Sequence, residues 1–525
     1  GSVALASARA NTGLVVNAKN DLTITTYSVS AGTAALTAGT TFTGTSGTAT
    51  GHITLDAVGN TSVGAVTSSA GTVDLEVTAG TLTTGAVSGL TGLVLKSSGN
   101  LATGALTSAN AGINAQSTAG SVALASAKAA SGLVANAKTT LAVTTYAVSA
   151  GTASLTAGTT YTGTSGTATG NITLDAVGNT SVGAVTSSGG TVDLEVTAGT
   201  LTTGAVSGGL GVTLKSSGNL GTGALTSLSG GVNALSSTGS VVITSAKAAT
   251  SLVANAKNDL NVTTYAVSGG TAVLTAGTTF TGTSGTATGH ITLDTVGNAS
   301  VGAVSSSQGS VDLETTAGTL TTGAVSGVAG VVLKSSGNLS TGALTSTNAG
   351  INAQSTTGSV ALASAKAGTS LVANANAALN LTTYTVSGGT ATLTAGTTFT
   401  GTSGTASGNI TLDAVGITSV GTVTSSAGSI DLDVTAGTLT TGAVTGLTGV
   451  VLKSSGNLST GALTSANGGI HALSTMGSVA LAVIRAVAII YCVISSAHSS
   501  REIGMAGDSG IDDENNGVTA AVGSR

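Results

Sequence analysis

The stretch that decides the fold is GTVDLEVTAG at residues 71–80, one of many similar stretches in the chain. Val73, Leu75 and Val77 alternate in it with polar neighbours. Side chains of a strand point alternately to its two faces, so this pattern predicts a strand with one buried face. One such strand cannot bury its apolar face alone and needs neighbours stacked on it.

The alternating pattern returns about every 20 residues, with glycines in the turns between. The leucines at the centres of four successive stretches are Leu36, Leu55, Leu75 and Leu95. Parallel stacking of such coils would align the leucines and pair each backbone group with the coils above and below. The sequence therefore predicts an all-β fold, a parallel β-helix (β-solenoid) with about 20 residues per coil. A row of separate β-sandwiches is the alternative.

A longer repeat contains about six coils. The segment GSVALAS at Gly1 returns at Gly120, in altered form at Gly239, again at Gly358 and in part at Gly477, a period of 119 residues. At about 4.8 Å per coil, four copies would stack to roughly 115 Å. The chain starts within a repeat without Met or a signal peptide, so we expect it to be part of a longer protein. The predicted units are repeats 1–119, 120–238, 239–357 and 358–476 and a tail, 477–525.

Composition excludes several classes of protein. The chain is 41% hydrophobic, carries a net charge of −5, and has no Pro and one Cys. Disordered chains combine low hydrophobicity with high net charge, which does not fit. Scattered Lys and Arg residues give no basic patch for nucleic acid, and Cys492 alone makes neither a disulfide framework nor a metal site.

Charged residues recur at fixed places. Asp56, Glu76 and Lys96 follow successive leucines, so we expect them in one column, with Glu76 and Lys96 paired. Two carboxylates side by side would suit a glycosidase. Four near-identical sites without a cleft favour a solvated charge ladder instead, and we expect no catalytic residue and no enzyme activity. The trio recurs as Asp175, Glu195, Lys215; Asp294, Glu314, Lys334; and Asp413, Asp433, Lys453.

Metal ligands and cofactors are not expected either. The Gly-Gly-x-Gly-x-Asp run of calcium-binding solenoids is absent, and Asp74 and Glu76 are read as solvated groups. His52 and His290 are replaced by Asn171 and Asn409 in the other copies. A polar surface position explains this exchange better than a ligand or a catalytic base.

Aromatic and threonine residues give two alternative binding functions. The aromatics could form sugar-binding platforms, although we expect them to pack in the core or at corners. The stretch TTFTGTSGTATG at residues 40–51 suggests an ice-binding threonine array, which the stretches GHITLDAVG and GTVDLEVTAG should interrupt. The aromatic columns are Tyr27, Tyr146, Tyr265, Tyr384 and Phe42, Tyr161, Phe280, Phe399.

Runs such as GSVALASAKA, GNITLDAVGNT and GTVDLEVTAGTLTTGAV resemble the repeat region of filamentous-haemagglutinin-type bacterial exoproteins, over residues 1 to about 482. The resemblance implies a right-handed β-helix, exported through an outer-membrane partner to the cell surface or medium. It also implies a role in adhesion or biofilm, with host-cell or matrix glycans or proteins as partners. Without a secretion-domain motif, an RGD or a toxin domain, the chain is expected to be a stalk that presents an adhesive or toxic tip. An ice-binding or glycan-binding surface is the alternative function.

The tail departs from the repeat after Ala482, reads VIRAVAIIYCVI and then becomes acidic. Its apolar part, residues 479–494, is shorter than the about 20 residues of a membrane helix. A cap on the last coil, a short apolar helix and a truncation artefact are the three interpretations. The open coil at Gly1 also suggests end-to-end or lateral self-association.

Overall fold

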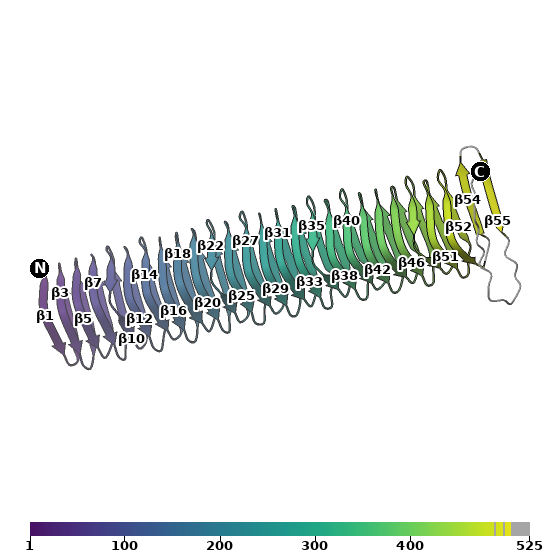
Figure 1. Ribbon diagram of the computed structural model, residues 1–525. Coiled ribbons are helices and arrows are strands. Elements are labelled where there is room, and N and C mark those ends of the chain that lie inside the picture. Colours follow the sequence, from purple (N-terminus) through teal and green to yellow (C-terminus); the bar gives the residue numbers. More distant parts are fainter. Residues whose placement is uncertain (488–489, 497–498, 506–525) are drawn as a thin grey trace. The chain divides into compact units, whose positions relative to one another are not determined.

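A computed structural model describes residues 1–487, 490–496 and 499–505. Its secondary structure is all β, without a helix in these ranges. The strands stack in parallel in about 24 turns of roughly 20 residues, a right-handed β-solenoid, so the predicted fold class is confirmed. The chain divides into two compact units, residues 1–264 and 265–525, each built of such turns (Figure 1).

Each turn contributes strands to two sheets. The long-strand sheet of the first copy consists of β1 (Val3–Ala10), β3 (Leu22–Val29), β5 (Phe42–Ala49), β7 (Thr61–Ser68), β9 (Leu82–Thr84), β10 (Val87–Gly89) and β12 (Leu101–Ser108). The short-strand sheet consists of β2 (Gly13–Ala18), β4 (Thr33–Ala38), β6 (Ile53–Ala57), β8 (Val73–Val77), β11 (Leu93–Ser97) and β13 (Ile113–Ser117). Later copies repeat this order, as β14 (Val122–Ala129) begins 119 residues after β1.

A bend divides each long strand. In β3, buried and exposed residues alternate except for two adjacent exposed residues in the middle. Such a break in the alternation marks a change in strand direction, because regular strands point successive side chains to opposite faces. In the fifth coil the bend separates two short strands, β9 and β10. Each coil therefore has three short sides around a narrow core.

The predicted leucine ladder forms the core of the short-strand sheet. Leu55 pairs in register with Leu36 on one side and Leu75 on the other, and Leu75 pairs with Leu95. None of the four is more than 1% exposed. Burying a leucine contributes roughly 1.5–3 kcal/mol relative to leaving it exposed. The ladder repeats this gain in four successive coils, after which Ala115 and Ala135 take the same register position.

The corners between strands are held by short polar side chains. Asn60 Oδ1 accepts the backbone N–H of Thr81, in the next coil, at 3.0 Å. Asn100 Oδ1 accepts the N–H of Ser121 at 2.9 Å in the same way. Backbone groups at a corner lie outside the ladder and need other partners. The recurring Gly-Asn turns thus supply the missing acceptors.

Inside the core, each tyrosine of the first aromatic column covers a glycine of the following coil. Tyr27 is the register partner of Gly47, and a Cβ added at Gly47 would lie 1.9 Å from Tyr27 Cζ. Only glycine leaves room for this close approach. The same pairs recur as Tyr146 with Gly166, Tyr265 with Gly285, and Tyr384 with Gly404.

The tail continues as strands. β53 (Val479–Ala486) extends the long-strand sheet, and β54 (Ile490–Ser496) pairs in parallel with β52 (Ile470–Ser474). β55 (Ser499–Met505) then runs antiparallel to β54. A short apolar helix is therefore wrong for these residues, which form strands. Reversal at β55 fits the cap interpretation, while the acidic end, 506–525, lies outside the described residues.

No helix in the described ranges is long and apolar enough to cross a membrane.

Candidate functional site

The outer face of the short-strand sheet carries three acidic residues in each copy. Glu76 is the register partner of both Asp56 and Lys96, so the predicted column is present. Asp74 lies two residues before Glu76 on β8 and points to the same face. Three carboxylates and one ammonium group thus lie together in each copy.

Ion pairs form in three of the four columns. Lys215 Nζ lies 3.4 Å from Glu195 Oε2, and Lys334 Nζ lies 3.6 Å from Glu314 Oε2. The fourth copy has a similar pair, Lys453 and Asp433, at 3.7 Å. Glu76 and Lys96 share a register position, but no ion pair joins them in the described structure. Their predicted pairing is wrong as a contact, although the equivalent residues of the other three copies do pair.

Several aspartates of the acidic clusters have a raised pKa, chiefly through burial. Partial burial raises the pKa of Asp74, Asp56 and Glu76 raise it further, and Lys96 partly offsets these effects. Burial and the charge of Glu76 also raise the pKa of Asp56. Asp74 Oδ1 is buried and has no hydrogen-bond partner among the described residues, as is true of its equivalents Asp193, Asp312 and Asp431. With raised pKa values, Asp56, Asp74, Asp193 and Asp312 retain their protons to higher pH than free aspartate does.

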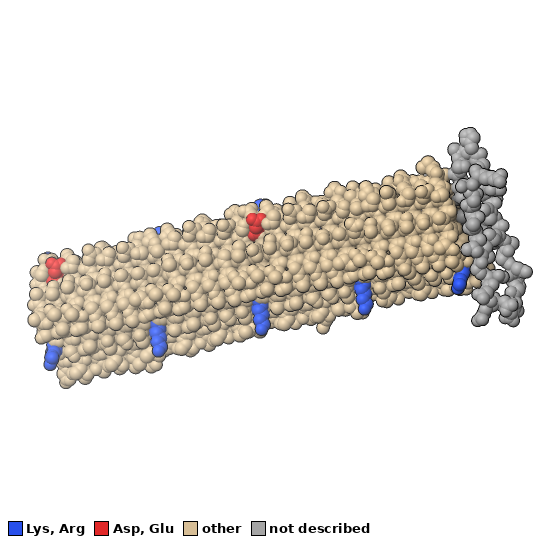
Figure 2. All heavy atoms as spheres, in the orientation of Figure 1, with Lys and Arg blue, Asp and Glu red and all other residues tan. Residues whose placement is uncertain are grey.

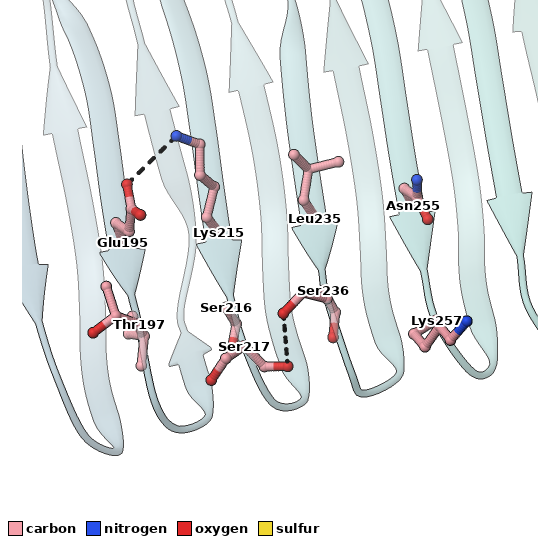
Figure 3. A pocket seen from close by; sticks show the side chains of 11 residues that line it. Glu195, Thr197, Lys215, Ser216, Ser217, Leu235, Ser236, Asn255 and Lys257 are labelled. Carbon is pink, nitrogen blue, oxygen red and sulfur yellow. Dashed lines mark hydrogen bonds and ion pairs between the residues drawn. The ribbon is translucent and has the colours of Figure 1, made fainter.

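A groove crosses the short-strand sheet from the second copy into the third (Figure 3). Its volume is about 570 Å³. Glu195, Lys215, Leu235 and Asn255 come from four successive coils in register, and Lys257 lies in the turn that follows. Lys215 is engaged by Glu195, which leaves the Lys257 ammonium and the Asn255 amide available to a polar ligand.

The groove differs from copy to copy. Gln116 and Gln354 replace Leu235, and Lys138 and Asn376 replace Lys257. No aromatic side chain lines the groove that contains Leu235 and Lys257. Within the described ranges, no group of three or more His, Cys, Asp or Glu side chains is arranged to hold a metal ion.

The histidine positions serve the corners. His52 Nδ1 accepts the backbone N–H of Thr72 at 3.1 Å, so the ring proton belongs on Nε2. Asn171 Oδ1 accepts the N–H of Thr191 at 2.9 Å. The interpretation of His52 as a polar surface position is confirmed, and this shared acceptor role explains why His and Asn alternate.

The aromatic columns are part of the core. None of the eight side chains is more than 7% exposed, so sugar-binding platforms made from them are wrong and the expected core packing is confirmed. Burial raises the pKa of Tyr27 well above its usual value. Its hydroxyl has no hydrogen-bond partner among the described residues.

The outer face of the long-strand sheet carries hydroxyl columns. Thr43 has Thr23 and Ser62 as its register partners. The stretches expected to interrupt the threonine array belong to the other sheet, so that comparison was wrong. Columns in the first unit still change after several coils, since Thr83 is followed by Ala102 and Ala123.

A second column on this face consists mainly of Ser and Thr residues, with a single basic residue in each copy. Between Arg9 and Lys128 the register runs through Ser28, Thr48, Thr67, Ser88 and Thr107. Basic side chains recur at intervals along the visible face, which also carries two isolated acidic groups (Figure 2). Within the second unit, the column from Lys366 to Arg485 holds Thr385, Thr405, Thr424, Thr445 and Thr464.

Searches of protein-family models, curated proteins and solved structures found no match to the chain.

Proposed function

We propose that the chain is the stalk of a secreted bacterial surface adhesin, which extends and presents a separate adhesive or toxic tip. The main support is the constancy of the repeat. The copies have the same strands at an interval of 119 residues, so the chain adds whole coils without insertions. Binding surfaces of solenoids commonly carry insertions on one face, whereas repetition without them chiefly produces length.

The chemistry of the surface agrees with this function. Charged residues make up 6% of the chain, and most of them recur at equivalent places in each copy. A catalytic centre needs a nucleophile, acid or base brought together at one geometry. The repeated acidic clusters instead offer the same few partly buried or exposed groups in every copy, so we propose no enzymatic role. By the sequence resemblance, an outer-membrane partner would export the chain, and its tip would meet glycans or proteins.

Solution scattering of the whole chain tests the shape that this function requires. About 24 coils at about 4.8 Å each should give a rod of roughly 115 Å. A compact particle would contradict the stalk.

Display on a cell tests the function itself. A known adhesive domain fused to the four-copy chain should bind its receptor through a capsule better than the same domain fused to two copies. Substitution of Thr48 and Lys128, on the face of the long-strand sheet, should leave the difference in receptor binding between the two fusions unchanged. Strong binding of the chain to host cells without the added domain would overturn the proposal.

Ice binding is a second candidate, favoured by the five successive threonines between Lys366 and Arg485. A thermal-hysteresis assay on the whole chain should show activity that the double variant T405Y/T424Y abolishes. A variant on the other sheet, T394Y/T411Y, is the control and should keep it. Absence of hysteresis in the unmodified chain would remove this candidate.

Glycan binding is a third candidate. Because the aromatic side chains are buried, the proposed binding surface is the groove beside Lys257. A glycan array should then give a signal that N255A/K257A loses and N136A/K138A, at the positions 119 residues earlier, keeps. An array without signal would exclude it.

A further inference from the structure

The two sheets carry opposite charge. Strands of the long-strand sheet contain only basic charged residues, one per copy: Arg9, Lys128, Lys247, Lys366 and Arg485. All five are exposed, and none takes part in an ion pair within the described structure. Strands of the short-strand sheet carry three acidic residues and one lysine per copy, such as Asp56, Asp74, Glu76 and Lys96.

Both charge patterns have the same period. Basic residues recur every six coils, which is roughly 29 Å at the strand spacing, and so do the acidic clusters. In the first copy, Asp56 lies two coils after Arg9, and Glu76 lies three coils after it. The acidic cluster is thus near the middle of the interval between Arg9 and Lys128.

We propose that the long-strand sheet of one molecule docks laterally on the short-strand sheet of a second copy. In a parallel arrangement shifted by two to three coils, each basic residue of one molecule meets an acidic cluster of the other. Flanking residues on the long-strand face, such as Ser28, Thr48 and Thr67, are small and allow close approach. The shared period brings every further pair of the same unit into contact at once.

Repetition gives this contact its strength. A single exposed ion pair contributes little to binding. Several pairs fixed on one chain act together, because each contact raises the effective concentration of the next. Since the two surfaces differ, the interface is heterologous and leaves a free surface on each side. Heterologous contacts that do not close a ring continue into open arrays. The expected product is therefore a growing bundle, and a closed dimer is not expected.

Sedimentation velocity on the full chain, at several concentrations in low and high salt, is the first test. The unmodified chain should form a series of species larger than a dimer, and 0.5 M salt should disperse them because it screens exposed charges. A chain that stays monomeric at low salt, or that stops at a dimer, would overturn the proposal. The stalk function would stand in either case, because it requires only length.

Charge reversal tests which surfaces meet. The long-sheet variant K128E/K247E/K366E and the short-sheet variant D56K/D175K/D294K/D413K should each lower self-association at least tenfold. A mixture of the two should associate again, since each then offers the other complementary faces. The control K19E/K138E/K257E makes the same charge change at exposed turn lysines and should associate as the unmodified chain does.

Circular dichroism of each variant shows whether it has folded before its association is read. An equal loss of self-association in the turn-lysine control would overturn the proposal. So would failure of the two folded charge-reversal variants to associate when they are mixed.

Discussion

Gly47 illustrates how closely neighbouring coils approach at single residues. The ring of Tyr27 occupies the space that any side chain at position 47 would need. Replacing Gly47 with Ala should force the ring aside and cost about 1–3 kcal/mol of stability, as overpacking of a core usually does. Hydrogen exchange should show the loss in the coils around residues 22–49, because each coil contacts only its neighbours.

Gly221 provides the matched control for Gly47. A Cβ added there meets no atom within 4 Å. G221A should therefore leave stability unchanged or raise it slightly, since alanine reduces the freedom of the unfolded chain. The double variant Y27L/G47A should regain part of the loss; equal effects of G47A and G221A would contradict the packing account.

His52 allows a second test at the residue scale. Asn holds the equivalent position in two copies and accepts the same kind of backbone N–H. H52N should leave the thermal midpoint unchanged, whereas H52A should lower stability by at most about 1 kcal/mol through the lost hydrogen bond. Thermal unfolding followed by circular dichroism compares the two. If His52 instead bound a ligand, H52N and H52A would weaken ligand binding to the same extent.

At the scale of strands and columns, the acidic clusters should make the fold respond unusually to acid. Asp74, Asp193 and Asp312 have pKa values raised chiefly by burial. The folded state therefore binds their protons more tightly than the unfolded state, and stability falls as pH rises through this window, above about pH 4. Acidification from pH 7 toward pH 4 should raise the thermal midpoint.

The triple variant D74N/D193N/D312N should show a smaller rise, because amides do not titrate and, among the aspartates of the acidic clusters, only Asp56 and Asp413 keep a raised pKa. Asp21 is the control with the opposite sign, since hydrogen bonds from Thr40 and Thr41 lower its pKa. D21N should therefore remove a small stabilisation that acid would otherwise abolish. A midpoint that falls steadily below pH 6 in both the unmodified chain and the triple variant would contradict the raised pKa values.

The strands could be predicted from the sequence, because the alternation of apolar and polar residues recurs in each coil. Leu55 and Leu75 could be matched from spacing alone, and so could the column of Asp56 and Glu76. Thr43 was compared with the wrong neighbours, because each 20-residue period contains strands of both sheets. Its true partners, Thr23 and Ser62, lie one full coil away.

Other features depend on register across coils. The cover of Tyr27 on Gly47 and the corner bond of Asn60 to Thr81 join residues 20 and 21 positions apart, on different elements. The tyrosine–glycine pair recurs in all four copies and the corner bond in three, with Ile417 in place of asparagine in the fourth. Recurrence was therefore a usable signal once the register was known. The separation of basic and acidic residues onto two sheets likewise required knowing which strands share a face.

At the scale of the whole molecule, one copy should be removable. Deleting residues 120–238 joins position 119 to Gly239, the equivalent of Gly120. The shortened chain should keep the same circular dichroism per residue and the same thermal midpoint. Deleting only residues 120–129 removes part of a coil, places strands in the wrong sheet and should destabilise the fold. Equal stability of both deletions would contradict a register of whole coils.

The interval of whole coils between copies also has a genetic consequence. Near-identical stretches of coding sequence invite unequal recombination, which adds or removes one repeat length at a time. Because each copy holds a complete set of coils, every product keeps its leucines, corner asparagines and charge columns aligned. A population could therefore vary the reach of this protein from one generation to the next, and each variant would still fold.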